Sequence, residues 1–133
     1  MLKAAQGCVV NVGGGAARSP GADSSIGASV NAAMGNFSKA HSQLGKRDGV
    51  NVNVIHPGAT ETERFYQSPE RRSKASGKSV DQLKQEGTAR DVLPRLGNAE
   101  GDSALTLFLC FEKARYIQGT AIAVDGGSTV GHY

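Results

Sequence analysis

The chain has 133 residues, about the length of one domain, and glycine supplies 18 of them without the Gly-x-y period of collagen. Hydrophobic residues make up 38% and charged residues 20%, which excludes the composition typical of disordered chains. No apolar run approaches the roughly 18 residues of a membrane helix, and the first six residues do not resemble a secretion signal. These features predict a soluble, cytoplasmic protein whose residues 1–133 form a single domain.

The charge pattern argues against nucleic-acid and membrane partners. The net charge is +3, and the basic residues between positions 71 and 84 are interleaved with acidic ones rather than forming a basic stripe with aromatic residues. The three histidines are not spaced as metal ligands, so no metal site is expected. Cys8 and Cys110 lie in apolar runs, which predicts buried thiols in a reducing compartment.

The first half of the chain predicts a strand, a helix and a second strand. Residues 8–12 are apolar and β-branched and precede three glycines, which indicates a strand buried on both faces. A helix is expected to begin between Ser24 and Ser29 and to end at Gly45. Its predicted buried face consists of Val30, Ala33, Met34, Phe37, His41 and Leu44. Residues 50–55 predict the second strand, which ends at Pro57–Gly58.

The second half of the chain is less regular at first. Residues 63–97 are expected to form an irregular lid, with a short helix at Thr62–Tyr66 and another that Ser79 caps and Gly87 ends. Residues 104–111 are almost entirely apolar, which predicts a helix covered by the sheet on one side and by another element on the other. Residues 120–124 predict the third strand.

This order of elements predicts an α/β fold, a partial Rossmann-like three-layer sandwich with a parallel sheet of about three strands. Ligands bind at the carboxyl ends of the strands in such sheets. Here those ends carry Gly13–Gly15, Pro57–Gly58 and Asp125–Gly127. Glycine lets the backbone approach a ligand or another loop closely at this edge.

Three segments together resemble the C-terminal half of the short-chain dehydrogenase/reductase family. Residues 7–12 resemble the family's fifth strand, and residues 50–62 resemble its sixth strand with the P-G-x-x-x-T cofactor loop. Residues 116–127 resemble the seventh strand with its Y-I-x-G…V-D-G-G ending. The resemblance extends from Met1 to about Thr129 and implies a Rossmann-type fold.

The resemblance also implies NAD or NADP as cofactor and hydride transfer between it and an alcohol or carbonyl substrate. The implied cofactor-binding residues are Gly13, Asn31, Pro57, Gly58, Thr60 and Thr62. In this interpretation Thr62 meets the nicotinamide carboxamide, with Thr60 as the alternative. A purely structural interpretation remains open, in which Pro57–Gly58 ends a strand and Thr62 caps a short helix.

The family's catalytic Ser, Tyr and Lys have no counterparts in this chain. By alignment, the serine falls on Gly13 or Gly14, the tyrosine near Ser24, Ile26 or Gly27, and the lysine on Val30 or Asn31. The lysine normally lowers the tyrosine's pKa for proton transfer, and an asparagine supplies no such charge. No catalytic residue is therefore expected. Tyr66 and Tyr116 are interpreted as packing or lid residues.

The family's phosphate-binding loop and its first four strands are also missing. Gly13–Arg18 lacks the third glycine of the G-x-G-x-x-G spacing. Residues 1–6 resemble the last turn of a helix with Gly7 as its stop, which suggests a truncated or split protein. The expected partners are a small-molecule substrate in the complete protein and either the missing N-terminal half or further copies of this chain. The alternative function is an inactive remnant that acts as an oligomeric interaction module.

Overall fold

A computed structural model describes residues 1–2, 4, 6–65, 67, 73, 77–88, 93 and 95–130. Its sheet contains β1 (Cys8–Val12), β2 (Asn51–Pro57) and β3 (Ala121–Val124) in the order β1-β2-β3. Both strand pairs are parallel, with Val10 opposite Asn53 and Ile55 opposite Ile122. The predicted parallel three-strand sheet is confirmed.

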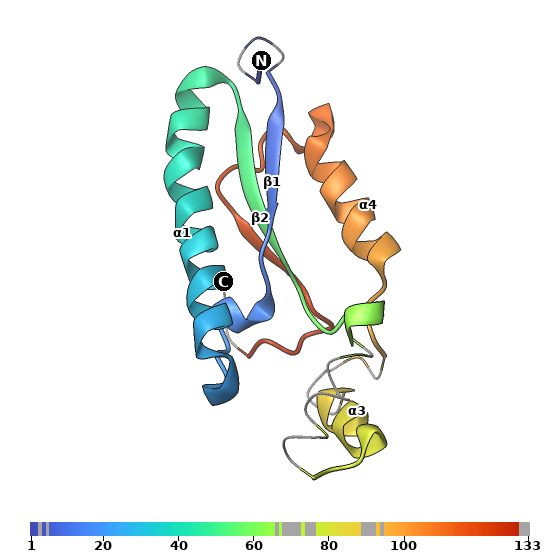
Figure 1. Cartoon of the computed structure of the whole chain (residues 1–133). Coiled ribbons are helices and arrows are strands. Elements are labelled where there is room, and N and C mark those ends of the chain that lie inside the picture. The colour runs from blue at the N-terminus through green and yellow to red at the C-terminus, as the bar shows by residue number, and fades with distance from the viewer. Residues whose placement is uncertain are drawn as a thin grey trace.

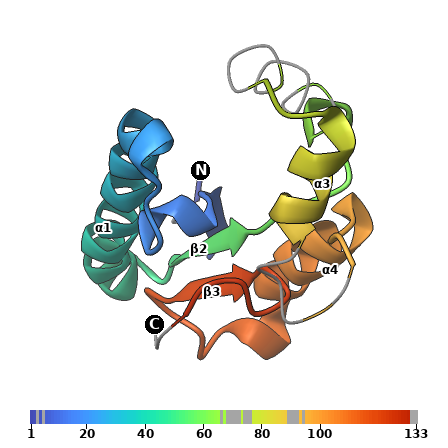
Figure 2. The same cartoon turned by 90° about the horizontal axis from the view of Figure 1, so that it is seen from below.

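Helices cover both faces of this sheet. The long helix α1 (Ser25–Asp48) lies along one face and α4 (Ala99–Cys110) along the other, as Figure 1 shows. The shorter α3 (Val80–Thr88) lies beyond the carboxyl ends of the strands (Figure 2). Single 3-10 turns at 15–17, 22–24 and 112–114 connect these elements. The three-layer α/β architecture is as predicted.

The face of α1 that packs on the sheet is not the one predicted. Its buried residues are small or polar, namely Ala28, Ser38, Ser42 and Gly45. Val30, Phe37 and Leu44, which were predicted to be buried, are instead 60%, 52% and 51% exposed. The reason is close packing: an added Cβ at Gly45 would collide with the Val50 carbonyl oxygen. Small side chains let α1 approach β2, and its large apolar side chains face outward.

Three predicted element ends also differ from the structure. The helix α1 continues to Asp48, because Gly49 rather than Gly45 adopts the left-handed conformation that ends it, with φ at 69°. The helix α3 continues past Gly87 to Thr88. At the start of the chain the left-handed residue is Gln6, with φ at 45°, and the Gly7 N–H donates to the Leu2 carbonyl.

Ser79 caps α3 as predicted. Its hydroxyl accepts a hydrogen bond from the Gln82 N–H at 3.2 Å, and the Gln82 side chain accepts one from the Ser79 N–H at 3.0 Å. This reciprocal pair satisfies two donors at the helix start. The start of α4 is capped by Asn98, whose side chain accepts from the Gly101 N–H.

The outer side of α4 is not covered by another element within the described chain. Leu109 is buried against the sheet, whereas Leu107, Phe108 and Phe111 are 60%, 42% and 61% exposed. Cys110 is exposed and Cys8 is at intermediate burial, so neither thiol is fully buried as predicted. The apolar residues around α4 predict that the helix is buried, but they do not identify the element or chain that covers its outer side.

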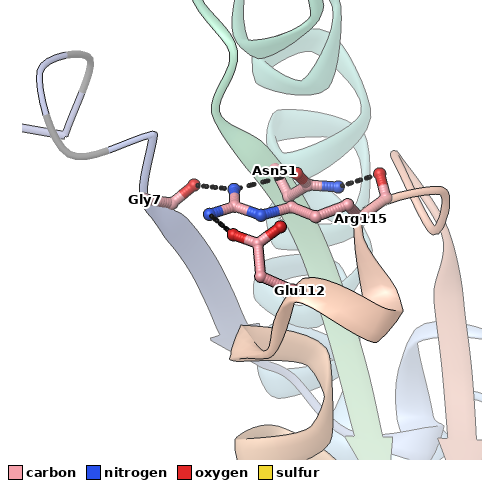
Figure 3. A network of polar contacts seen from close by, with 4 residues as sticks. All are labelled: Gly7, Asn51, Glu112 and Arg115. Atoms are coloured by element: carbon pink, nitrogen blue, oxygen red, sulfur yellow. Dashed lines mark hydrogen bonds and ion pairs between the residues drawn. The ribbon is translucent and has the colours of Figure 1, made fainter.

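A polar network holds together the amino end of the sheet. The Arg115 guanidinium donates to the Gly7 carbonyl at 3.1 Å and to Asn51 Oδ1 at 3.4 Å, and it pairs with Glu112 (Figure 3). The Asn51 amide donates in return to the carbonyls of Arg115 and Ile117. This network joins β1, β2 and the turn that leads from α4 into β3.

Candidate functional site

The carboxyl ends of β1 and β2 bring several predicted site residues together. The Gly13 N–H donates to the Ile55 carbonyl at 2.9 Å and so continues the pairing of these strands. Gly14 follows in an extended conformation beside Asn31 of α1, so that an added Cβ would lie 3.4 Å from Asn31 Nδ2. Gly13, Asn31 and the end of β2 therefore border one part of the sheet edge.

Gly13 lies against a buried histidine. An added Cβ at Gly13 would lie 2.7 Å from His56 Nδ1, so the ring of His56 occupies the space of a side chain there. Burial lowers the pKa of His56, the nearby Arg18 charge lowers it further, and a hydrogen bond with the Gly14 backbone partly opposes both. The family's serine aligns with Gly13 or Gly14. A serine side chain at Gly13 would crowd the His56 ring, whereas one at Gly14 would make an ordinary contact with Asn31.

Gly58 makes a close approach to β3. An added Cβ would lie 2.7 Å from both Cα and Cβ of Asp125, and the Gly58 N–H donates to the Val124 carbonyl at 3.0 Å. Close packing between the ends of β2 and β3 is therefore sufficient to explain why position 58 is glycine. This supports the structural interpretation of Pro57–Gly58 without testing a contact with cofactor.

The two candidate threonines differ in their hydrogen bonds. Thr60 Oγ1 donates to the Asp102 carboxylate of α4 at 3.2 Å, and Thr60 forms an isolated bridge with Gly97. Thr62 is exposed, and its hydroxyl accepts from the Phe65 N–H at 3.3 Å at the start of the helical residues 63–65. Thr62 thus caps this short segment as the structural interpretation predicted, and Tyr66 at its end lies outside the described residues.

The end of β3 forms a tight carboxylate turn. Asp125 Oδ1 accepts from the Gly127 N–H and Oδ2 accepts from the Thr129 N–H, each at 3.0 Å. Burial by itself would raise the pKa of Asp125, but the hydrogen bonds from Thr129, Gly127 and Ser128 outweigh burial and lower it. The Asp125 carboxylate therefore stabilises this turn by accepting hydrogen bonds from its backbone.

Two of the cavities that border the sheet lie away from the predicted cofactor-binding residues. One of about 520 Å³ lies between α1 and the β2–β3 face, and Arg18, Lys39 and His56 are among its lining residues. The other, of about 290 Å³, lies beside Asp102 and Asp125. None of the six predicted cofactor-binding residues lines either cavity. They border an open sheet edge instead.

The catalytic positions offer no side chain for proton transfer. Gly14 and Gly27 have none, and the Asn31 amide does not titrate at ordinary pH. Tyr116, interpreted above as a packing or lid residue, is instead fully exposed before β3, with a relative exposure of 103%. In the described part of the chain, no three His, Cys, Asp or Glu side chains are placed to hold a metal ion. Nor is any described helix long and apolar enough to cross a membrane.

Comparison with known proteins gives a consistent assignment. The family model described as enoyl-(acyl carrier protein) reductase matches residues 1–129. The NADPH-dependent reductase BacG of Bacillus subtilis is 34% identical over 122 residues, which cover 92% of this chain and 47% of that protein. A 3-oxoacyl-[acyl-carrier-protein] reductase FabG of Chlamydia muridarum is 33% identical over 129 residues, which cover 96% of this chain and 47% of the relative.

Solved structures agree with the sequence relatives. YwfH, an NADPH-dependent reductase involved in bacilysin biosynthesis, has a TM-score of 0.89 and 31% identity over 98% of this chain and 50% of its own. L-sorbose reductase from Gluconobacter frateurii, solved with NADPH and L-sorbose, has a TM-score of 0.88 and 26% identity over 98% and 51%. The chain spans about half the length of the relatives it matches. With its parallel sheet and its two covering helices, the chain belongs to the short-chain dehydrogenase/reductase family.

Proposed function

We propose that this chain supplies the C-terminal half of an NAD(P)-dependent oxidoreductase that transfers a hydride between the cofactor and an alcohol or carbonyl substrate. The single observation that carries the proposal is the shared sheet edge, where Gly13 and the Pro57–Thr62 segment lie at the ends of two adjacent parallel strands and Asn31 of α1 lies beside them. Ligands of open parallel sheets bind at this edge. The reductases that this chain resembles are named for their use of NADPH.

Within this proposal, Thr62 rather than Thr60 meets the carboxamide of the nicotinamide. The hydroxyl of Thr60 bonds the Asp102 carboxylate of α4. The Thr62 side chain is exposed, and its hydroxyl bonds neighbours within the loop, the Thr60 carbonyl and the Phe65 N–H, so a ligand at the edge can reach it. Pro57 fixes the direction in which the chain leaves β2, because its ring restricts φ. Gly58 holds the loop against Asp125, and Asn31 and Gly13 form the neighbouring wall.

In this proposal these residues bind the cofactor and take no part in the transfer of a proton or hydride. NAD(P)H supplies the hydride when bound. The positions aligned with the family's Ser, Tyr and Lys hold Gly13 or Gly14, then Ser24, Ile26 or Gly27, and then Val30 or Asn31. A proton donor near the substrate carbonyl is worth roughly 10²–10⁴-fold in rate. We therefore expect no measurable reductase activity from residues 1–133 alone.

The test is a titration of the isotopically labelled chain with NADPH, followed by amide chemical shifts. Because the Gly13–Arg18 segment lacks the third glycine of a phosphate-binding loop, we expect the dissociation constant to be about millimolar or weaker. The amides of Gly13, Gly58 and Thr62 should shift, whereas Gly49, at the opposite end of the sheet, serves as the control. Shifts at Gly49 alone, or none at about 10 mM NADPH, would contradict the proposal.

The proposal extends to domain organisation and location. We treat residues 1–133 as one domain and residues 63–97 as the lid that shapes substrate choice, since this segment follows the cofactor loop and leads to α4. We place the protein in a reducing compartment, the cytoplasm, because Cys8 and Cys110 are free thiols.

An oligomeric interaction module is the second candidate function, and the outer surface of α1 favours it. Ile26, Val30, Phe37 and Leu44 recur at four- and seven-residue intervals and are 83%, 60%, 52% and 51% exposed. Residues at these spacings share one side of a helix, so the four side chains form a continuous apolar stripe. Such a stripe indicates a protein contact.

Light scattering on the purified chain tests this second function. We expect dimers or larger assemblies, and we expect Phe37→Glu to shift the population toward monomer. Gln43→Glu, which adds the same charge at an exposed position of α1 outside the stripe, is the control. A monodisperse monomer of the unaltered chain with a cooperative thermal transition would exclude self-association through this face.

A further inference from the structure

The two cysteines of the chain meet across one face of the sheet. Cys8 is the first residue of β1, and Cys110 is the last residue of α4. Asn11 of β1 bonds Ser38 of α1, and strand side chains alternate between faces, so Cys8 points to the opposite face, toward α4. There Cys110 is near enough to influence the Cys8 thiol. Arg115 confirms that the two positions are neighbours, because its guanidinium donates to the carbonyl of Gly7, next to Cys8, and pairs with Glu112, two residues after Cys110.

We propose that Cys8 and Cys110 are a redox pair that closes to an intramolecular disulfide and joins β1 to the end of α4. Neighbouring thiols that face each other from a strand and a helix need side-chain rotation and a small approach to reach the S–S distance of about 2 Å. The pair also differs in access, because Cys110 is exposed while Cys8 is partly buried. An oxidant therefore reaches Cys110 first, and Cys8 is the resolving partner.

With hydrogen peroxide as the oxidant, the chemistry balances in two steps. The Cys110 thiolate attacks one peroxide oxygen, the O–O bond breaks, and the products are a Cys110 sulfenic acid and hydroxide. Cys8 sulfur then attacks the Cys110 sulfur, the S–O bond breaks, and a second hydroxide leaves. The protons released by the two thiols convert both hydroxides to water. Two thiols have been oxidised and one peroxide reduced.

The surroundings of Cys8 agree with its role as the second, slower thiol. Burial and, to a smaller extent, the neighbouring Cys110 thiol raise the pKa of Cys8 to about 11, with the Arg115 charge opposing both. The thiolate is the nucleophile in such chemistry, so Cys8 in the intact protein is a poor first target for oxidant. It becomes effective once a sulfenic acid stands beside it.

A closed disulfide would fasten the edge strand β1 to α4. Cys8 and Cys110 lie near opposite ends of the sequence, and joining distant residues restricts the unfolded chain strongly. Oxidised protein should therefore melt at a higher temperature than reduced protein. Because the bond is reversible by thiols, this cross-link would respond to the redox state around the protein.

The experiment oxidises the fully reduced chain at low concentration with hydrogen peroxide, and in parallel with diamide. The products are analysed by intact mass and by maleimide counting of free thiols. We expect a product about 2 Da lighter, with no free thiol, that remains a single chain on a non-reducing gel. Dithiothreitol should restore both thiols.

Two variants assign the order of events. In Cys8→Ser, the Cys110 sulfenic acid cannot be resolved internally, so dimedone labelling should exceed that of the unaltered chain about tenfold. In Cys110→Ser, Cys8 should keep its thiol under the same peroxide treatment. Retention of both thiols with both oxidants, preferential joining of two chains in native buffer, or equal dimedone labelling of unaltered and Cys8→Ser protein would each overturn the proposal.

Discussion

The two ends of the sheet are built in different ways. At the amino end, side-chain amides link the elements: Asn51 and Asn53 both donate to the Ile117 carbonyl, and Gln118 donates to the carbonyls of Ser42 and Val50. At the carboxyl end, glycines allow backbone and side chains to touch, as Gly13 does with His56 and Gly58 with Asp125. Side-chain amide bonds therefore distinguish the amino end, where Gly45 also packs closely against Val50, and close contacts at glycine distinguish the carboxyl end.

This difference separates residues that hold the fold from residues available to a ligand. Buried amides that are fully hydrogen-bonded specify one arrangement, because any alternative leaves polar groups without partners. The carboxyl end instead presents the exposed Thr62 hydroxyl and the extended Gly14 backbone. We therefore expect substitutions at the amino end to reduce stability, and substitutions at exposed positions of the carboxyl end, such as Thr62, to change binding instead.

The largest expected effect is that of Gly45→Ala. The added methyl group would collide with the Val50 carbonyl oxygen, so α1 has to shift away from the start of β2. Overpacking in tight sites costs roughly 1–3 kcal/mol and occasionally more, and we expect the upper end, about 3 kcal/mol, because backbone atoms must move. The free energy of unfolding from urea titration at fixed protein concentration measures this loss.

Gly27→Ala is the matched control for this prediction. Gly27 lies in the same helix, and no atom outside its own helix lies within 4 Å of an added Cβ. Alanine favours helix over glycine by roughly 1 kcal/mol, so this variant should be slightly more stable than the unaltered chain. Equal losses in both variants would show that close packing at the amino end is not what α1 depends on.

A smaller loss is expected for Asn53→Ala. The Asn53 side chain is 1% exposed, donates to the Ile117 carbonyl at 3.0 Å and accepts from the Thr120 N–H at 3.1 Å. Its removal takes the acceptor from the Thr120 N–H, while the Ile117 carbonyl keeps the bond from Asn51, which predicts a cost of about 1–3 kcal/mol. Asn36→Ala, at an exposed position of α1, should change the unfolding free energy by less than about 0.5 kcal/mol.

Sequence patterns predicted the strands well because periodicity and turn chemistry are local. The runs at 8–12, 50–55 and 120–124 are apolar and end in glycine or proline, and all three form parallel strands. Ser79 was identified as a cap because its hydroxyl bonds a neighbour three residues away. The site edge followed from the same reasoning, since parallel strands end on the same side.

Packing partners could not be predicted in the same way. The apolar periodicity of α1 was detected correctly, but it marks a face that lies away from the sheet, and the true contact uses Ser38, Ser42 and Gly45. Serines give no apolar signal. Likewise, His56 gave no motif, yet its ring fills the space beside Gly13, a contact between residues distant in sequence. Such contacts depend on how elements approach each other.

At the carboxyl end, Gly13→Ser and Gly14→Ser should differ sharply. Serine at 13 would place its Cβ 2.7 Å from the His56 ring and is expected to cost about 1–3 kcal/mol. Serine at 14 would make its nearest contact at 3.4 Å with Asn31, in an extended backbone that any residue adopts, and should cost less than about 0.5 kcal/mol. Thermal unfolding of the two variants side by side decides which position can hold the family's serine.

The smallest expected effect concerns pH and His56. Burial and, to a smaller extent, the Arg18 charge lower the pKa of His56 in the folded chain, whereas a histidine in an unfolded chain has a pKa of about 6.5. Between these two values the unfolded state binds more protons, so the free energy of unfolding falls as the pH drops below about 6.5 and levels off below the folded pKa. In His56→Gln this component of the pH dependence should vanish between about pH 7 and pH 5, while His41→Gln, on the exposed side of α1, should retain it. If the unfolding free energy of His56→Gln depends on pH as that of the unaltered chain does, then protonation of the ring beside Gly13 does not destabilise the fold. The carboxyl end of the sheet would then be no more sensitive to a buried charge than the amino end.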